Sequence, residues 1–235
     1  MNKSPFQFKQ FSVAQNNCGM KVNTDGVLLG AWCDSSDANM ILDIGTGTGV
    51  IALMMAQKNR TAQIHAIDID QHAYQQAKEN FERSAWNGRL TALCTSLQNY
   101  NSTTRYDIII SNPPYFIDDQ KNDSHQKNVA RHSVALSYSD LTSGISRLLD
   151  DNGKAFLVLP AFNFSLFQNI AAVHKLFITR HTEVIALDGK APYLVLLQLQ
   201  YAKRIFTKTQ ITIQDSTRVF SVEYKAITKD FYLKF

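Results

Sequence analysis

The feature that most constrains the fold of this sequence is an alternation of short apolar segments with segments of helical pattern. Apolar runs at 40–44 and 63–68 are each followed by a predicted helix, over 50–58 and 71–83. Strands joined through a helix do not form hairpins. They lie parallel in one sheet, with helices on both faces. The alternation continues with strands predicted at 90–94, 106–111 and 154–159 and helices at 136–149 and 162–173.

The alternation ends with a change of strand direction. Strands predicted at 177–187 and 193–201 are separated by only five residues, with no helix between them. Strands joined this closely form an antiparallel hairpin. We therefore predict an α/β fold: a doubly wound, Rossmann-like, seven-stranded and mostly parallel sheet with a reversed last strand. Residues 211–214 fit an additional edge strand.

The chain shows no internal repeat and no linker, so residues 1–235 are predicted to form a single domain. A helix is expected to begin at Thr24 or Asp25, either of which can cap a first turn. This helix either packs at the edge of the core or covers a bound ligand. Three parts are expected, namely an N-terminal lid or extension, a catalytic core and a basic C-terminal extension, over 1–39, 40–201 and 202–235.

Composition excludes several classes of protein. The sequence contains no run of 18 apolar residues, so a membrane span is not expected. The first residues lack the apolar stretch of a signal peptide, which favours a cytoplasmic protein. The cysteines are odd in number and widely spaced, which predicts reduced, mostly buried thiols and neither disulfides nor a metal site: Cys18, Cys33 and Cys94.

The net charge of +4 is confined to the C-terminal part of the chain. Residues 1–198 carry 17 basic and 17 acidic side chains, whereas residues 199–235 carry seven basic and three acidic ones. A polyanion such as RNA would be attracted to this region, although a solvated basic surface explains the same pattern. The candidate contacts to an RNA backbone are Lys203, Arg204, Lys208, Lys225 and Lys229.

A proline-rich motif, Asn112-Pro113-Pro114-Tyr115, directly follows the apolar strand predicted at 106–111. The prolines fix φ and lack an N–H, and a residue before proline is held extended. The Asn112 side-chain oxygen and the Pro113 carbonyl are then free to accept hydrogen bonds from a planar amino group. Tyr115 offers a flat face for stacking. Taken alone, the motif is equally consistent with a turn that ends a strand.

A glycine loop, Gly45-Thr46-Gly47-Thr48-Gly49, follows the first predicted strand. Its glycines allow a tight turn into the helix and a close approach of a ligand to the backbone. The loop lacks the Gly-Lys-Ser/Thr of a P-loop, and its spacing differs from a dinucleotide fingerprint. Asp43 before the loop suits a cationic amino-acid group. Asp68 ends the next strand, where an acid can bind ribose hydroxyls, while Asp70 fits an N-cap.

Together these residues resemble the class I methyltransferases that use S-adenosylmethionine, in the branch with an Asp/Asn-Pro-Pro-aromatic motif. The resemblance implies that Asp43 and the glycine loop hold the methionine part of the cofactor and that Asp68 holds its ribose. Relatives often place an acid after the third strand, where this chain has Cys94-Thr95-Ser96, so the partner of the adenine ring is left open. The expected cofactor contacts are Lys21, Thr24, Asp43, Gly45, Thr46, Gly47, Gly49, Asp68, Ile69, Thr95, Ser96 and Asn112.

A narrower resemblance covers nearly the whole chain. The segments at 6–9, 20–32, 130–132 and 224–233 are similar to the bacterial tRNA-valine adenine-37 N6-methyltransferases. Membership would imply that an anticodon-loop adenine of a tRNA is the substrate, and a monomer is the expected state. Arg131 and His132 are candidate contacts to RNA or to the acceptor pocket, although a loop arginine and a surface histidine are commonly only solvated.

The residues by themselves leave the acceptor open. The four motif residues would serve a protein glutamine amide, an adenine in DNA or a guanine 2-amino group in ribosomal RNA equally well. A different class of function is an RNA-binding module that merely retains S-adenosylmethionine. For an amine acceptor, Asn112 and the Pro113 carbonyl would stabilise charge that develops on the nitrogen, while Tyr115 stacks the base. Neither a general base nor a metal ion is required.

Overall fold

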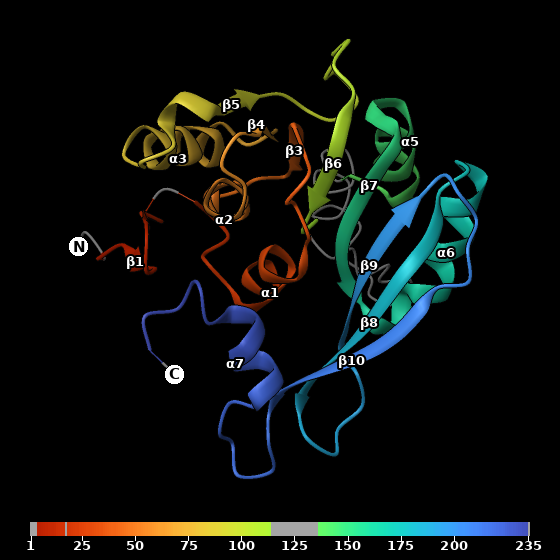
Figure 1. Ribbon diagram of the computed structural model, residues 1–235. Coiled ribbons are helices and arrows are strands. Elements are labelled where there is room, and N and C mark those ends of the chain that lie inside the picture. Colours follow the sequence, from red (N-terminus) through yellow and green to blue (C-terminus); the bar gives the residue numbers. More distant parts are fainter. Residues whose placement is uncertain (1–3, 17, 114–135, 235) are drawn as a thin grey trace, which may run out of the picture.

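One eight-stranded sheet forms the centre of the protein, in a computed structural model that describes residues 4–16, 18–113 and 136–234 (Figure 1). The strand order is β10-β8-β9-β7-β6-β3-β4-β5. The bounds are β3 Met40–Ile44, β4 Gln63–Asp68, β5 Leu90–Cys94, β6 Tyr106–Ser111, β7 Leu149–Pro160, β8 Phe177–Leu187, β9 Leu194–Gln200 and β10 Thr207–Gln214. A small separate hairpin pairs β1 Phe6–Gln7 with β2 Ser12–Val13.

The predicted fold class is confirmed. Seven strands lie where the apolar segments placed them, and β9 alone runs antiparallel to its two neighbours, β7 and β8. The eighth strand, β10, pairs in parallel with β8 at the edge of the sheet. The prediction of an edge strand at 211–214 was therefore too short at its beginning. Strand β9 lies between β7 and β8 and runs in the opposite direction. The chain therefore returns to the amino ends of the parallel strands before β10 begins.

Helices cover both faces of the sheet (Figure 1). One face carries α1 Thr24–Trp32, α2 Val50–Lys58, α3 Gln71–Glu82 and α7 Val222–Thr228. The other face carries α5 Tyr138–Leu148 and α6 Phe164–Val173. The alternation of side chains along a strand explains the two cores, because Ile108 and Ile110 of β6 face the first group of helices and Ile109 faces the second. Short 3₁₀ turns at Asn87–Arg89 and Ala161–Asn163 precede β5 and α6.

Several local predictions were wrong. The N-cap of α1 is Asn23, whose side chain accepts a hydrogen bond from the Gly26 amide at 2.9 Å, and not Thr24 or Asp25. The strand predicted at 154–159 begins earlier, at Leu149, which pairs with Tyr106 as the first residue of β7. The helix predicted from residue 162 begins at Phe164, and Phe162, in the 3₁₀ turn before it, is 76% exposed. Helix α7 was not predicted.

The cysteine prediction holds in part. All three cysteines are free, and Cys33 is buried, but Cys18 is half-buried and Cys94 is exposed. Asp70 is the N-cap of α3, as predicted, with its carboxylate accepting from the His72 amide at 2.8 Å. His65 is half-buried, and its Nδ1 lies 2.7 Å from the Tyr106 hydroxyl.

The last glycine of the loop before α2 is required by its surroundings. Gly49 has a φ of 81°, and a Cβ added there would lie 2.5 Å from Cε1 of Phe81. We expect Gly49→Ala to lower the free energy of unfolding by about 3 kcal/mol, as the sum of backbone strain and overpacking. Gly45→Ala is the matched control, because Gly45 has a φ of 69° but no atom within 4 Å of the added Cβ.

Urea denaturation of the two variants would separate these contributions. The control should lose only the cost of the left-handed backbone, about 1–2 kcal/mol. Equal destabilisation of the two variants would contradict the role assigned to the contact with Phe81.

Candidate functional site

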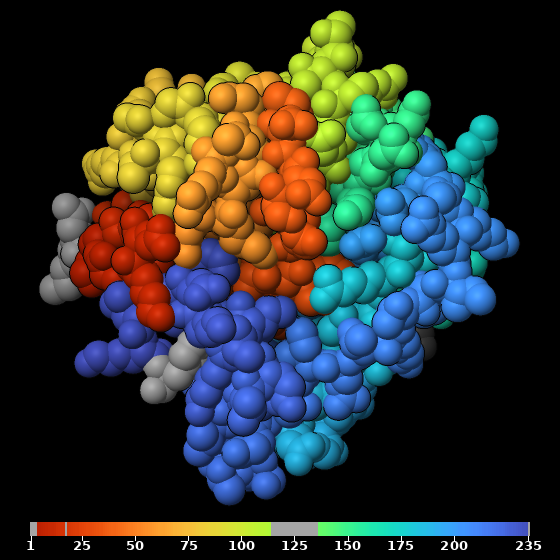
Figure 2. Space-filling view, viewed as in Figure 1, coloured from red at the N-terminus to blue at the C-terminus, as the bar shows by residue number. Residues whose placement is uncertain are grey.

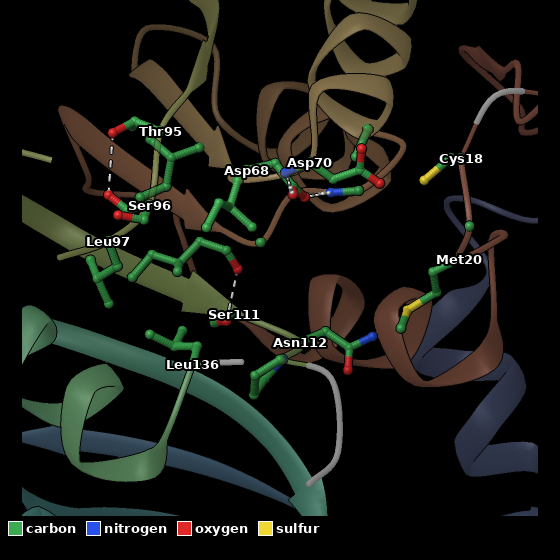
Figure 3. Close-up of a pocket in the computed structure, with 18 of the residues that line it drawn as sticks. Cys18, Met20, Asp68, Asp70, Thr95, Ser96, Leu97, Ser111, Asn112 and Leu136 are labelled. Atoms are coloured by element: carbon green, nitrogen blue, oxygen red, sulfur yellow. Dashed lines mark hydrogen bonds between the residues drawn. The ribbon is translucent and has the colours of Figure 1, made fainter. Parts of the chain in front are cut away.

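A cavity of about 300 Å³ opens at the carboxyl ends of the central parallel strands (Figure 3). Gly45 and Gly47 of the glycine loop line it together with Asn112 and Pro113. The two motifs that the sequence singles out therefore share one cavity, as their placement after adjacent strands β3 and β6 predicts. The remaining lining residues are Cys18, Gly19, Met20, Ile44, Ile67, Asp68, Ile69, Asp70, Ala73, Thr95, Ser96, Leu97, Gln98, Ser111 and Leu136.

The glycine loop is held by backbone hydrogen bonds to the neighbouring strand. The amides of Gly45 and Thr46 both donate to the Ile67 carbonyl, at 2.9 and 3.1 Å. Gly45 and Gly47 have φ values of 69° and 57°, a region that other residues adopt at a cost. A Cβ added to Gly45 would have no atom within 4 Å. A Cβ added to Gly47 would have the Cys18 sulfur as its nearest neighbour, at 3.9 Å. Side chains here would occupy space inside the cavity.

Asp68 connects this loop to the end of β4 (Figure 3). Its Oδ2 accepts a hydrogen bond from the Gly47 amide at 2.8 Å, and its Oδ1 accepts one from the Asp70 amide at 2.9 Å. Burial raises the pKa of Asp68 above its ordinary value, and these two hydrogen bonds oppose that shift. Each carboxylate oxygen has two lone pairs, so both remain able to accept from a ligand hydroxyl.

Asp43 lies behind the glycine loop and does not line the cavity. Its Oδ2 accepts from the Thr46 hydroxyl at 2.6 Å, whereas its buried Oδ1 makes no hydrogen bond of normal geometry with the described residues. Burial is the main cause that raises the pKa of Asp43 to about 7, and the negative charge of Asp68 adds to it. An unsatisfied buried carboxylate oxygen is a favourable partner for a cationic group.

The end of β6 fixes the position of Asn112. The Ser111 hydroxyl donates to the Ile44 carbonyl at 2.8 Å, which ties this strand end to that of β3. The Asn112 amide lies against the first turn of α1, because its Nδ2 is 3.4 Å from the position of a Cβ on Gly26. The rest of the proline motif, Pro114 and Tyr115, and the candidates Arg131 and His132 lie outside the described residues.

The predicted cofactor contacts divide into two groups. Those that line the cavity are Gly45, Gly47, Asp68, Ile69, Thr95, Ser96 and Asn112. Those that do not are Lys21, Thr24, Asp43, Thr46 and Gly49. Thr24 belongs to α1, whose residues from Gly26 to Trp32 are buried, so this helix packs in the core.

Sequence reasoning missed the segment Cys18–Met20, which borders the cavity from the side opposite the strand ends (Figure 3). It also missed Leu97 and Gln98, which continue the wall begun by Thr95 and Ser96 after β5. The only signal for the latter was their position after a predicted strand. For Cys18–Met20 the sequence offers no pattern, because the approach of this segment to the loop depends on the tertiary fold.

The predicted RNA contacts are separated by the topology of the sheet. Because β9 is reversed, Lys203 and Arg204 follow its end at the amino edge of the parallel strands, opposite the cavity. Lys208 is the second residue of β10 and forms an ion pair with Glu183 at 2.8 Å. Lys225 lies on α7. Lys229 follows this helix and precedes Asp230, whose carbonyl accepts from the Gln57 side chain near the end of α2 at 2.9 Å.

Two further findings concern the described residues only. Among them, no group of three or more His, Cys, Asp or Glu side chains is placed to hold a metal ion. Within the same residues, the helices are too short or too polar to cross a membrane.

Comparison with known proteins identifies the family. The model of the methyltransferase small domain matches residues 19–162. A protein of Bacteroides fragilis named tRNA1(Val) (adenine(37)-N6)-methyltransferase is 42% identical, with 100% of each chain covered. The protein of the same name from Pseudoalteromonas translucida is 39% identical, over 98% of this chain and 99% of that one. This chain belongs to the tRNA1(Val) (adenine(37)-N6)-methyltransferase family.

Solved structures agree with this fold for a member of that family. A protein from Agrobacterium tumefaciens, described as a predicted O-methyltransferase, superposes with a TM-score of 0.69 at 15% identity, covering 88% of this chain and 96% of that one. The ribosomal protein L11 methylase of Lactobacillus delbrueckii gives a TM-score of 0.53 at 17% identity, covering 74% and 76%. At these identities the likeness concerns the fold alone, which is that of the class I methyltransferases.

Proposed function

We propose that this protein transfers a methyl group from S-adenosylmethionine to the exocyclic N6 of adenine 37 in the anticodon loop of tRNA-Val. The observation that carries the proposal is the single cavity that Gly45, Gly47, Asn112 and Pro113 line together. Methyl transfer to an amine requires donor and acceptor in contact, because positioning supplies much of the rate enhancement. The full-length similarity to relatives of this name supports the choice of acceptor.

The residues around the cavity fit S-adenosylmethionine. Asp68 at the end of β4 can accept hydrogen bonds from both ribose hydroxyls, as in other doubly wound nucleotide sites. Ile67, Ile69, Ala73 and Leu97 supply apolar surface for an adenine ring, with Thr95, Ser96 and Gln98 nearby. Asp43 is buried behind the loop and outside the cavity lining, so it would favour a cationic amino-acid end through its charge and not by direct contact. When bound, the cofactor supplies a methyl group on an electron-poor sulfonium.

Asn112 and the carbonyl of Pro113 would act on the acceptor. The lone pair of the 6-amino group is delocalised into the purine ring, so this nitrogen is a poor nucleophile. Hydrogen bonds from its N–H groups to two fixed oxygen acceptors favour a pyramidal nitrogen and stabilise the positive charge that develops on it. The proton is lost afterwards to solvent, so the reaction requires no side chain as general base. We further propose that Tyr115 stacks the flipped-out base.

Labelled S-adenosylmethionine tests the proposal directly. Purified protein should transfer label to a tRNA-Val transcript with adenine at position 37, and digestion followed by mass spectrometry should recover N6-methyladenosine. A transcript with guanine at that position is the matched control and should remain unlabelled. Label in ribosomal RNA guanine, in DNA or in a protein amide would identify one of the other planar amines as acceptor. Retention of tRNA without any transfer would favour a binding module.

A further inference from the structure

Two adjacent loops project from the molecule (Figure 2). Both follow the carboxyl ends of strands, β8 and β10, which is the end of the sheet where the cavity opens. We call them the twin loops: residues 188–193 between β8 and β9, and residues 215–221 between β10 and α7. They are joined at their base, where the Asp188 amide donates to the Gln214 carbonyl at 2.9 Å. Figure 1 shows them side by side beneath α7, in cyan and dark blue.

The second of these loops is a defined turn. The Arg218 amide donates to the Asp215 carbonyl at 2.9 Å, and the Asp215 amide donates to the Val219 carbonyl, also at 2.9 Å. Oδ1 of Asp215 accepts from the Thr217 amide and hydroxyl at 2.8 and 2.6 Å. The hydrogen bonds to this carboxylate, led by those from the Thr217 hydroxyl and the Val219 amide, lower the pKa of Asp215. The turn is therefore held by its own acid.

The twin loops begin next to the acceptor site. The hydroxyl of Tyr193, at the end of the first loop, donates to Oδ1 of Asp25 at 3.3 Å. Asp25 lies in the first turn of α1, directly before Gly26, whose Cβ position is 3.4 Å from the Asn112 amide. Helix α7, which continues the second loop, packs against α1. A polymer that delivers a base to Asn112 therefore passes close to this projection.

The twin loops carry two cations, exposed apolar groups and two acids, Asp188 and Asp215, which accept hydrogen bonds within their own loops. Lys190 and Arg218 are exposed, and neither forms an ion pair with a described residue. Beside Arg218, Phe220 is 40% exposed and Val222 is 80% exposed. Arg218 also adopts a φ of 64°, which costs a non-glycine residue about 1–2 kcal/mol. Cations beside an exposed aromatic ring are the side chains that bind phosphates and bases of RNA.

We propose that the twin loops bind the backbone of the substrate RNA through Lys190 and Arg218 while its target base occupies the acceptor site. This inference rests on the proposed function, because it names the surface that presents the RNA to Asn112. It assigns no RNA contact to Lys203 and Arg204, which are exposed at the amino ends of the parallel strands. Each pair carries two positive charges, so charge alone does not distinguish Lys190 and Arg218 from Lys203 and Arg204. The reversal of β9 places the two pairs at opposite ends of the sheet.

Matched double variants test the proposal. Lys190→Gln with Arg218→Gln removes two charges from the twin loops, and Lys203→Gln with Arg204→Gln removes two charges from the opposite edge. Glutamine keeps a β-carbon, so the backbone strain at residue 218 is the same in the parent protein and in the twin-loop variant. The affinity for tRNA-Val is measured without cofactor at several salt concentrations, and methyl transfer is measured separately. Thermal melting checks that each variant folds like the parent protein.

The twin-loop variant should bind tRNA about tenfold more weakly, and the slope of log affinity against log salt should fall by about 1.5, as for two lost phosphate contacts. Its transfer rate at saturating tRNA and its cofactor affinity should not change, and the control pair should match the parent. The inference would be overturned if the twin-loop variant bound tRNA as tightly as the parent, or if the control variant lost as much tRNA affinity. In either case methyl transfer by the parent protein would still support the proposed function. A parent protein that methylates no RNA would overturn both proposals.

Discussion

Replacing Asn112 with alanine is expected to lower the rate of methyl transfer by about 10³-fold, the upper range for loss of one preorganised polar group in an active site. The side-chain oxygen of Asn112 would act on the amine only as positive charge develops there. Its removal should therefore reduce the rate more than ground-state binding. Single-turnover transfer to tRNA-Val measures the rate, and calorimetry measures the affinity for S-adenosylmethionine, which should stay within about threefold of the parent value.

The conservative variant Asn112→Asp is the control for this prediction. It keeps an oxygen at the same position after Ser111, so it should retain more activity than the alanine variant. A merely structural role for Asn112 would instead make both variants unstable, because the residue lies against Gly26 at the start of α1. Loss of cofactor affinity as large as the loss of rate would contradict the assignment of Asn112 to the acceptor.

The strands of this protein could be predicted well because their apolar segments are short, buried and bounded by polar residues. The predicted bounds of β3, β4, β5, β6 and β8 are those observed. Predictions failed where pairing in three dimensions extends an element. The first residues of β7 are polar, Asp150 and Asp151, and they are a strand because Leu149 pairs with Tyr106 of β6. No local pattern marks such a pairing.

The site was predictable to the extent that it follows from strand order. Parallel strands bring their carboxyl ends to one edge, so the glycine loop, Asp68 and Asn112 had to converge. The contribution of Cys18–Met20 could not be predicted, because this segment reaches the loop only through the packing of the folded N-terminal region. The excess of basic residues in the C-terminal part can be read from the sequence, but only the reversal of β9 places Lys203 and Arg204 at the end of the sheet opposite the twin loops.

Replacing Asp68 with alanine should have the converse effect to the Asn112 variant. Loss of two hydrogen bonds to a charged group corresponds to about 3 kcal/mol, or about a hundredfold weaker binding of S-adenosylmethionine. The Gly47 amide would also lose its acceptor at 2.8 Å, which loosens the loop that holds the methionine part. Binding of tRNA without cofactor should not change. The contacts that connect the twin loops to Asn112 run through Tyr193 and Asp25, and Asp68 takes no part in them.

Calorimetry with the cofactor and filter binding with tRNA distinguish the two roles. Asp68→Asn is the control, because its side-chain oxygen can still accept from the Gly47 amide while its charge is lost. It should bind the cofactor with intermediate affinity, and high cofactor concentration should restore transfer in both variants to within several-fold of the parent rate. A rate that stays low at saturating cofactor would place Asp68 in the transfer step. Such a result would contradict the separate roles inferred from the positions of the two residues, with Asp68 on β4 holding the donor and Asn112 after β6 holding the acceptor.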